Sequence, residues 1–127
     1  MTFDKFTVNA QEAVLKSQQI AAGNEQQMVD TAHLLKGIIE TDKSVVQFLF
    51  NKMGMNMSQV IEKTNEAVSK LPKVEGAGSE KQYLSNDSNQ VLSSAKKLMN
   101  EFGDEYVSLE LILLAIVKND DTTGNML

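Results

Sequence analysis

The spacing of apolar residues predicts helices along most of the chain. After Thr7, whose hydroxyl is suited to cap a helix, small and apolar residues fall on one helical face as far as Ala21, and Gly23 is placed to end that helix. Three further segments with the same helical period follow before residue 71. Their expected N-caps are Asp30, Ser44 and either Asn56 or Ser58.

The pattern stops at Leu71–Ser85 and then starts again. Pro72 cannot continue a helix, and Gly76, Gly78 and Ser79 add backbone freedom, so an irregular connector is expected here. Beyond it, Ser85 or Asn86 is expected to cap a helix that Gly103 ends, and Ser108 to cap Leu109–Val117. The last residues, DDTTGNML, predict a turn and the beginning of another helix that buries nothing.

The two sides of the connector match without a gap when the sequence is shifted by 78 positions. Thr7 then falls on Ser85 and Asp30 on Ser108, so that caps meet caps and apolar faces meet apolar faces. We therefore predict an all-α fold of two pseudo-symmetric four-helix repeats within one domain. Repeat one spans 1–70, the connector 71–85 and repeat two 86–127, and the second repeat is expected to be truncated at its C-terminal end.

Composition limits the partners and the compartment. The chain of 127 residues has a net charge of −5, and all 12 basic residues are lysine. Without arginine and with an acidic balance, nucleic acid is an unfavourable partner. There is no cysteine, and the N-terminus lacks the features of a signal peptide. The longest apolar run, Leu109–Val117, is well below the roughly 20 residues that span a bilayer, so we predict a soluble cytoplasmic protein without a membrane partner.

Few residues are suited to catalysis or metal binding. The chain has no P-loop motif, and its single histidine, His33, is expected to be a packed imidazole that donates to a backbone carbonyl. Glu62 and Glu66 lie one helical turn apart, a spacing that solvated helix faces carry routinely. The methionines at 53, 55 and 57 are expected to fill a helix–turn–helix corner in preference to forming an adaptable surface. We predict that this chain is not an enzyme and holds neither a metal nor a cofactor.

The segment Leu109–Val117 is apolar nearly all round, with Glu110 its only charge. Such a helix is either wholly buried or exposes an apolar strip. Burial between the repeats is slightly favoured on physical grounds. The alternative is a groove for unfolded polypeptide, in which Leu111 and Leu114 are exposed beside Leu92.

Four stretches carry a resemblance to a known family. They are MTFDKFT at the start, Asp30–Ile39 with its His-Leu-Leu triplet, the connector sequence LPKVEGAG, and FGDEYVSLEL at 102–111. In this order and spacing they resemble the duplicated N-terminal Clp repeat domain of Clp-family AAA+ unfoldases, and most closely that of the ClpB-type disaggregase chaperones.

The resemblance implies a site and a function. In such domains an early threonine and two acidic residues contact unfolded substrates, and these match Thr7, Asp104 and Glu110, beside an apolar groove that matches Leu92 and Leu111. The implied function is recognition of exposed apolar segments of unfolded or aggregated protein, which are passed to a hexameric motor that uses ATP and Mg²⁺ and lies outside this chain. The isolated domain is expected to be a monomer. The alternative is an adaptor-docking domain of a protease-associated Clp unfoldase.

Overall fold

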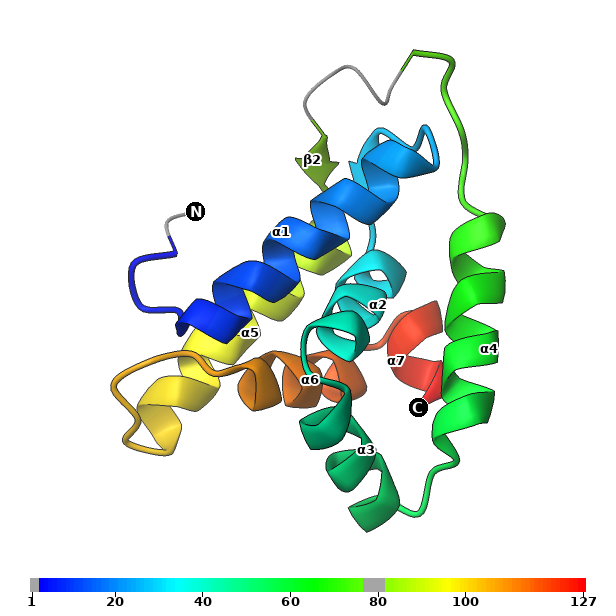
Figure 1. Ribbon diagram of the computed structural model, residues 1–127. Coiled ribbons are helices and arrows are strands. Elements are labelled where there is room, and N and C mark those ends of the chain that lie inside the picture. The colour runs from blue at the N-terminus through cyan, green and yellow to red at the C-terminus, as the bar shows by residue number, and fades with distance from the viewer. Residues whose placement is uncertain (1–2, 77–81) are drawn as a thin grey trace.

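The structure, a computed structural model, describes residues 3–76 and 82–127; Gly78 and Ser79 of the connector therefore lie outside the described residues. Helices make up most of the fold, as the sequence predicts (Figure 1). In chain order the elements are α1 (Val8–Gly23), β1 (Met28–Val29), α2 (Thr31–Thr41), α3 (Lys43–Lys52), α4 (Met57–Ser69), β2 (Tyr83–Leu84), α5 (Asn86–Glu101), α6 (Leu109–Lys118) and α7 (Thr122–Met126). No helix in the described ranges is long and apolar enough to cross a membrane.

The helix starts follow the capping chemistry of the sequence with one exception. Thr7, Asp30, Asn56, Ser85 and Ser108 each accept a hydrogen bond from a backbone N–H of the first turn. The expected cap at Ser44 is wrong. The Asp42 side chain caps α3 instead, because its Oδ1 accepts from the Val45 N–H at 3.2 Å.

The ends of α1 and α5 share one backbone geometry. In α5, Gly103 has φ 72° and the Asp104 N–H donates to the Met99 carbonyl at 2.9 Å, which is a Schellman motif. In α1 the left-handed residue is Glu25, with φ 55°, and the Gln26 N–H donates to the Ala21 carbonyl at 2.9 Å. Gly23 is the last residue of α1, as expected, but the left-handed position after the helix is occupied by Glu25 and not by this glycine.

Two short strand contacts show how the repeats are related. Val29 pairs with Leu84 in the parallel pair β1–β2, and Phe6 pairs with Val107 in an isolated parallel bridge. The shift of 78 positions maps Phe6 onto Leu84 and Val29 onto Val107. Val29 of the first copy thus pairs with Leu84, the equivalent of Phe6, and Phe6 of the first copy pairs with Val107, the equivalent of Val29. Pseudo-two-fold symmetry between the copies requires this exchange. The expected duplication is confirmed.

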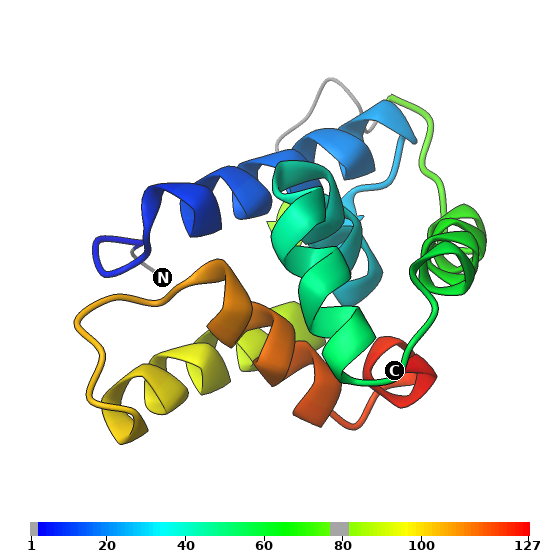
Figure 2. The same cartoon turned by 60° about the horizontal axis from the view of Figure 1, so that its bottom comes forward.

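The core lies between the two repeats. The helix α1 packs on α2 and α5 packs on α6, while α2 and α6 contact each other in the centre. In Figure 2, α1 and α5 accordingly lie along opposite edges of the molecule. The approach of α1 to α2 depends on Gly37, since a Cβ there would come within 2.5 Å of the Ala13 carbonyl oxygen.

The C-terminal residues are better packed than the sequence suggests. Thr123 and Gly124 of α7 are buried, and Met126 and Leu127 pack against the core. The Thr31 hydroxyl donates to the Asp121 carboxylate at 2.7 Å, which ties α7 to the start of α2. The expectation that this tail buries nothing is wrong, because α7 packs on α6 and α4 and bonds to Thr31, which lies 90 positions away.

Candidate functional site

The fold places Thr7 against the loop that joins α5 to α6. The Thr7 N–H donates to the Val107 carbonyl at 2.9 Å, and the Val107 N–H donates to the Lys5 carbonyl at 2.6 Å. These bonds flank the Phe6–Val107 bridge. A residue from the beginning of the chain is thereby held next to the loop that carries Asp104, and we call residues 101–110 the repeat-two corner.

The two predicted acidic residues frame this corner. Asp104 follows the left-handed Gly103, and Glu110 lies in the first turn of α6, two residues after the cap Ser108. Both side chains are exposed. Glu110 also carries its negative charge at the positive end of a helix dipole, where it stabilises α6. The two carboxylates are thus available to a partner in solution.

Thr7 is half-buried, and its side chain caps α1. Its Oγ1 accepts from the Ala10 N–H at 3.1 Å, so the ordinary structural explanation for this threonine holds. Accepting a hydrogen bond uses a lone pair and leaves the hydroxyl proton available to donate. Thr7 can therefore cap α1 and bond a ligand at the same time.

The three predicted groove leucines do not form an exposed groove. Leu92 is completely inaccessible and Leu111 is only 6% exposed, whereas Leu114 is half-buried. The exposure expected for Leu111 beside Leu92 is wrong. Both side chains belong to the core cluster, because α5 packs on α6 and α6 on α2. The burial alternative therefore describes these two leucines, and no direct contact with a ligand can be assigned to them in this conformation.

Other residues of α1 and of the repeat-two corner expose apolar side chains. Val8 and Leu15 of α1 are 72% and 53% exposed, and Phe102 and Tyr106 of the repeat-two corner are 59% and 51% exposed. The two α1 residues line a shallow hollow of about 360 Å³ together with Phe3 and Val14. Sequence reasoning missed all four exposed side chains. The repeat alignment contains a signal for them, since the equivalent positions hold Asn86, Ser93, Asn24 and Met28.

His33 is buried, but its partners differ from the expected backbone carbonyl. The imidazole Nδ1 accepts from the Asp30 N–H at 2.9 Å, so Nε2 carries the proton and donates to Gln26 Oε1 at 2.6 Å. Gln26 is itself buried, and its amide donates to the Val68 carbonyl at 2.7 Å. Burial, and secondarily the charge of Lys36, lowers the pKa of His33 to about 4, so the ring is neutral at pH 7. This network joins α2 to the end of α4 and has a structural role.

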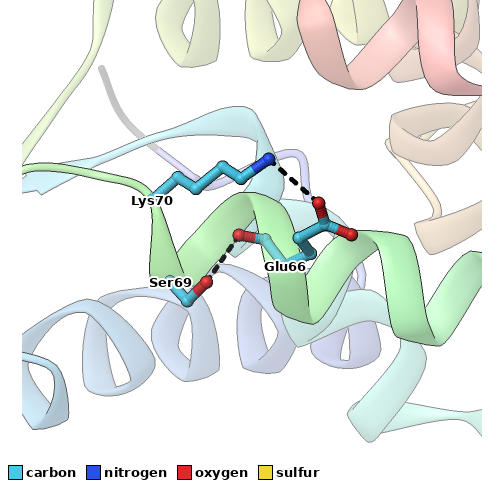
Figure 3. Close-up of polar contacts among 3 residues, drawn as sticks. All are labelled: Glu66, Ser69 and Lys70. Atoms are coloured by element: carbon cyan, nitrogen blue, oxygen red, sulfur yellow. Dashed lines mark hydrogen bonds and ion pairs between the residues drawn. The ribbon is translucent and has the colours of Figure 1, made fainter.

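The remaining polar candidates are solvated. Lys70 Nζ lies 2.9 Å from the Glu66 carboxylate, and both side chains are exposed. Figure 3 shows this ion pair at the end of α4. The hydrogen bond from Lys70 and its charge lower the pKa of Glu66, which suits a surface ion pair and is opposite to what a general acid needs. Of the methionines, Met55 and Met57 pack against the core and Met53 is 43% exposed. In the described part of the chain, no group of three or more His, Asp or Glu side chains could hold a metal ion.

The fold and the corner define a class of protein: a duplicated, all-α domain whose two halves exchange strand contacts. The model of the Clp repeat (R) N-terminal domain matches residues 5–127, and the chain belongs to this family. It is 39% identical over its whole length to the chaperone protein ClpB of Bacteroides thetaiotaomicron, and 36% identical over 117 residues, 92% of the chain, to that of Porphyromonas gingivalis. The chain spans only 14% and 13% of these two chaperones.

Solved structures show the same fold. The N-terminal domain of Hsp104 from Candida albicans matches with a TM-score of 0.82 at 23% identity, over 91% of this chain and 75% of that one. The N-terminal domain of ClpD from Arabidopsis thaliana, a chaperone associated with caseinolytic protease, matches with a TM-score of 0.74 at 23% identity, over 98% of this chain and 84% of that one. At these identities the likeness concerns the fold alone.

Proposed function

We propose that this domain recognises exposed apolar segments of unfolded or aggregated polypeptide for an ATP-dependent disaggregase. The observation that carries the proposal is the repeat-two corner. Thr7 comes from the start of the chain, while Asp104 and Glu110 both lie in the corner. The fold holds Thr7 by a backbone bond to the loop between the two acids, and both acids are exposed. The ClpB chaperones to which the chain is similar support the same function.

The surface around the corner is suited to bind many different polypeptide sequences. Exposed side chains of Val8, Leu15, Phe102 and Tyr106 offer apolar contacts that many sequences can satisfy. The carboxylates of Asp104 and Glu110 disfavour acidic segments and self-association. Leu114 is half-buried on α6 and can add apolar area at its edge, whereas Leu92 and Leu111 support the site from the core.

The wider role rests on the relatives. In the proposed setting this domain is tethered to a hexameric motor in the cytoplasm that binds ATP and Mg²⁺, and the tether raises the local concentration of substrate at the motor. The domain itself needs no cofactor for this work and performs no catalysis. Isolated in solution, it is a monomer.

Docking of a folded adaptor is the second candidate function. The N-terminal domain of ClpD, a chaperone associated with caseinolytic protease, has the same fold, so the fold is compatible with either function. The connector sequence LPKVEGAG and the identity to ClpB chaperones favour the disaggregase instead. A pull-down that compares an unfolded protein with a folded adaptor as bait separates the two.

Binding of a fluorescently labelled, permanently unfolded protein tests the proposal. The change is Asp104→Ala together with Glu110→Ala, and fluorescence anisotropy gives the Kd. We expect about a tenfold weaker Kd, because two exposed groups that bond the ligand are lost at roughly 0.5–1.5 kcal/mol each.

The matched control is Glu62→Ala with Glu40→Ala, which removes two exposed carboxylates from α4 and α2 and leaves the net charge equal to that of the test variant. An unchanged Kd in the corner variant, or an equal loss in the control, would contradict the proposed site.

A further inference from the structure

Two aromatic side chains project from the repeat-two corner without a structural reason. Phe102 is the C-cap residue of α5 and is 59% exposed, and Tyr106 directly precedes the buried Val107 and is 51% exposed. A residue at either position could be polar without loss of core packing. Repeat one demonstrates this for the position of Phe102, since the polar Asn24 stands there and the helix end has the same Schellman geometry, while the position of Tyr106 holds Met28.

The two corners also differ in what covers them. In repeat one, the buried Gln26 donates to the carbonyls of Val68 and Leu71, and the Glu25 carbonyl accepts from the Val74 N–H at 2.8 Å. The end of α4 and the beginning of the connector thus close that corner. At the position equivalent to Gln26, repeat two has the exposed Asp104. From Glu101 to Tyr106 every residue is exposed.

The charge at the repeat-two corner has one sign. Between Lys97 and Lys118 the sequence contains four acidic residues and no basic one, and all four are exposed: Glu101, Asp104, Glu105 and Glu110. At the equivalent positions repeat one has Gly23, Gln26, Gln27 and Ala32. The Lys5 carbonyl accepts a hydrogen bond from the Val107 N–H, and both Lys5 and its neighbour Asp4 are exposed.

We propose that Phe102 and Tyr106 give this site a preference for polypeptide segments in which lysine or arginine lies next to apolar residues. The inference rests on the proposed function and specifies its substrate class. A cationic side chain over the face of an exposed aromatic ring is stabilised by the ring quadrupole, and nearby carboxylates attract the same cation. Aliphatic stems of lysine and arginine and the neighbouring apolar side chains gain contact area on the same rings. Repeat one, closed and without these rings, does not share the preference.

The test uses two unstructured, labelled peptides with identical apolar residues, one carrying three lysines and the other three glutamates in their place. Fluorescence anisotropy at low and at physiological salt gives the Kd of each. The variant Phe102→Leu with Tyr106→Leu removes both rings, retains apolar side chains and leaves the net charge unchanged. Phe48→Leu is the matched control, because Phe48 is 60% exposed on α3, away from the corner.

We expect the unaltered domain to bind the lysine peptide at least tenfold more tightly than the glutamate peptide. The double leucine variant should weaken lysine-peptide binding about five- to tenfold, as two exposed cation–π contacts imply, whereas Phe48→Leu should leave it unchanged. If the double variant melts at a lower temperature than the unaltered domain, Tyr106→Leu alone is compared instead.

Equal binding of the two peptides, or an undiminished preference in the leucine variant, would overturn this inference and leave the proposed function standing. Binding of neither peptide nor the unfolded protein would overturn both.

Discussion

His33 and Gln26 illustrate what single residues contribute to this domain. His33 combines an N-terminal cap interaction with a long-range one, because Nδ1 accepts from the Asp30 N–H and Nε2 donates to Gln26. The side-chain amide of Gln26 in turn donates to the Val68 carbonyl, 42 positions along the chain. The side chains of His33 and Gln26 are buried and their polar atoms have partners, which is the condition under which buried polar groups stabilise a fold.

This network predicts a pH dependence of stability. The folded pKa of His33 is lowered to about 4 from 6.5, so between these pH values the unfolded chain binds a proton that the folded chain does not. Stability from this group is complete above about pH 6.5 and falls with decreasing pH by up to ~1.4 kcal/mol per unit. Urea unfolding of the native chain and of His33→Gln at pH 7 and pH 5 measures it.

Glutamine at this position keeps a side chain that can accept from the Asp30 N–H, but it does not titrate. The loss of stability from pH 7 to pH 5 should therefore be smaller in His33→Gln. Asp30, whose pKa is raised chiefly by burial, acts in the opposite direction in both proteins and cancels in the comparison. An equal loss in the two proteins would show that His33 is not the titrating group.

At the residue scale the sequence predicts hydrogen bonds between residues close in the chain well and hydrogen bonds between distant residues poorly. The caps at Thr7, Asp30 and Ser108 follow from hydroxyl and carboxylate groups placed just before a helical period. The burial of Gln26 could not be predicted, because its acceptors are backbone carbonyls of a helix far along the chain.

At the scale of elements, α6 decides how the candidate site is understood. This helix is packed on several sides, because it contacts α5, α7 and α2. Leu111 is consequently a core residue, while Leu114 lies half-buried at the edge of the core cluster. The sequence shows that α6 is apolar nearly all round, yet it cannot distinguish burial from an exposed strip, because that depends on which helices pack against it.

Truncation of the two leucines separates these positions. Leu111→Ala should lower the free energy of unfolding by about 2–4 kcal/mol, because it leaves a cavity in the core. Leu114→Ala should cost clearly less, because solvent already reaches its side chain. Chemical denaturation of both variants measures the difference, and equal costs would contradict the burial assigned here.

At the scale of the whole molecule, the duplication explains the arrangement of the helices, and the positions at which the two repeats differ mark the proposed site. The exchanged pairs Phe6–Val107 and Val29–Leu84 confirm the relation that the 78-residue shift predicts. The repeats diverge where repeat one closes its corner with Gln26 and repeat two leaves Asp104 exposed. The acidic residues of the proposed site come from the family resemblance. The exposure of Phe102 and Tyr106 could not be predicted, because the sequence does not show which segments pack against a helix end.

The central claim is that unfolded polypeptide binds at the repeat-two corner, and amide chemical-shift mapping tests it most directly. The ¹⁵N-labelled domain is titrated with an unfolded protein, and the shifted amides are located on the fold. We predict that the largest shifts fall on Thr7 and residues 101–110, while the equivalent corner at residues 23–32 remains unchanged. Shifts of equal size at both corners, or shifts confined to α3 and α4, would contradict the account.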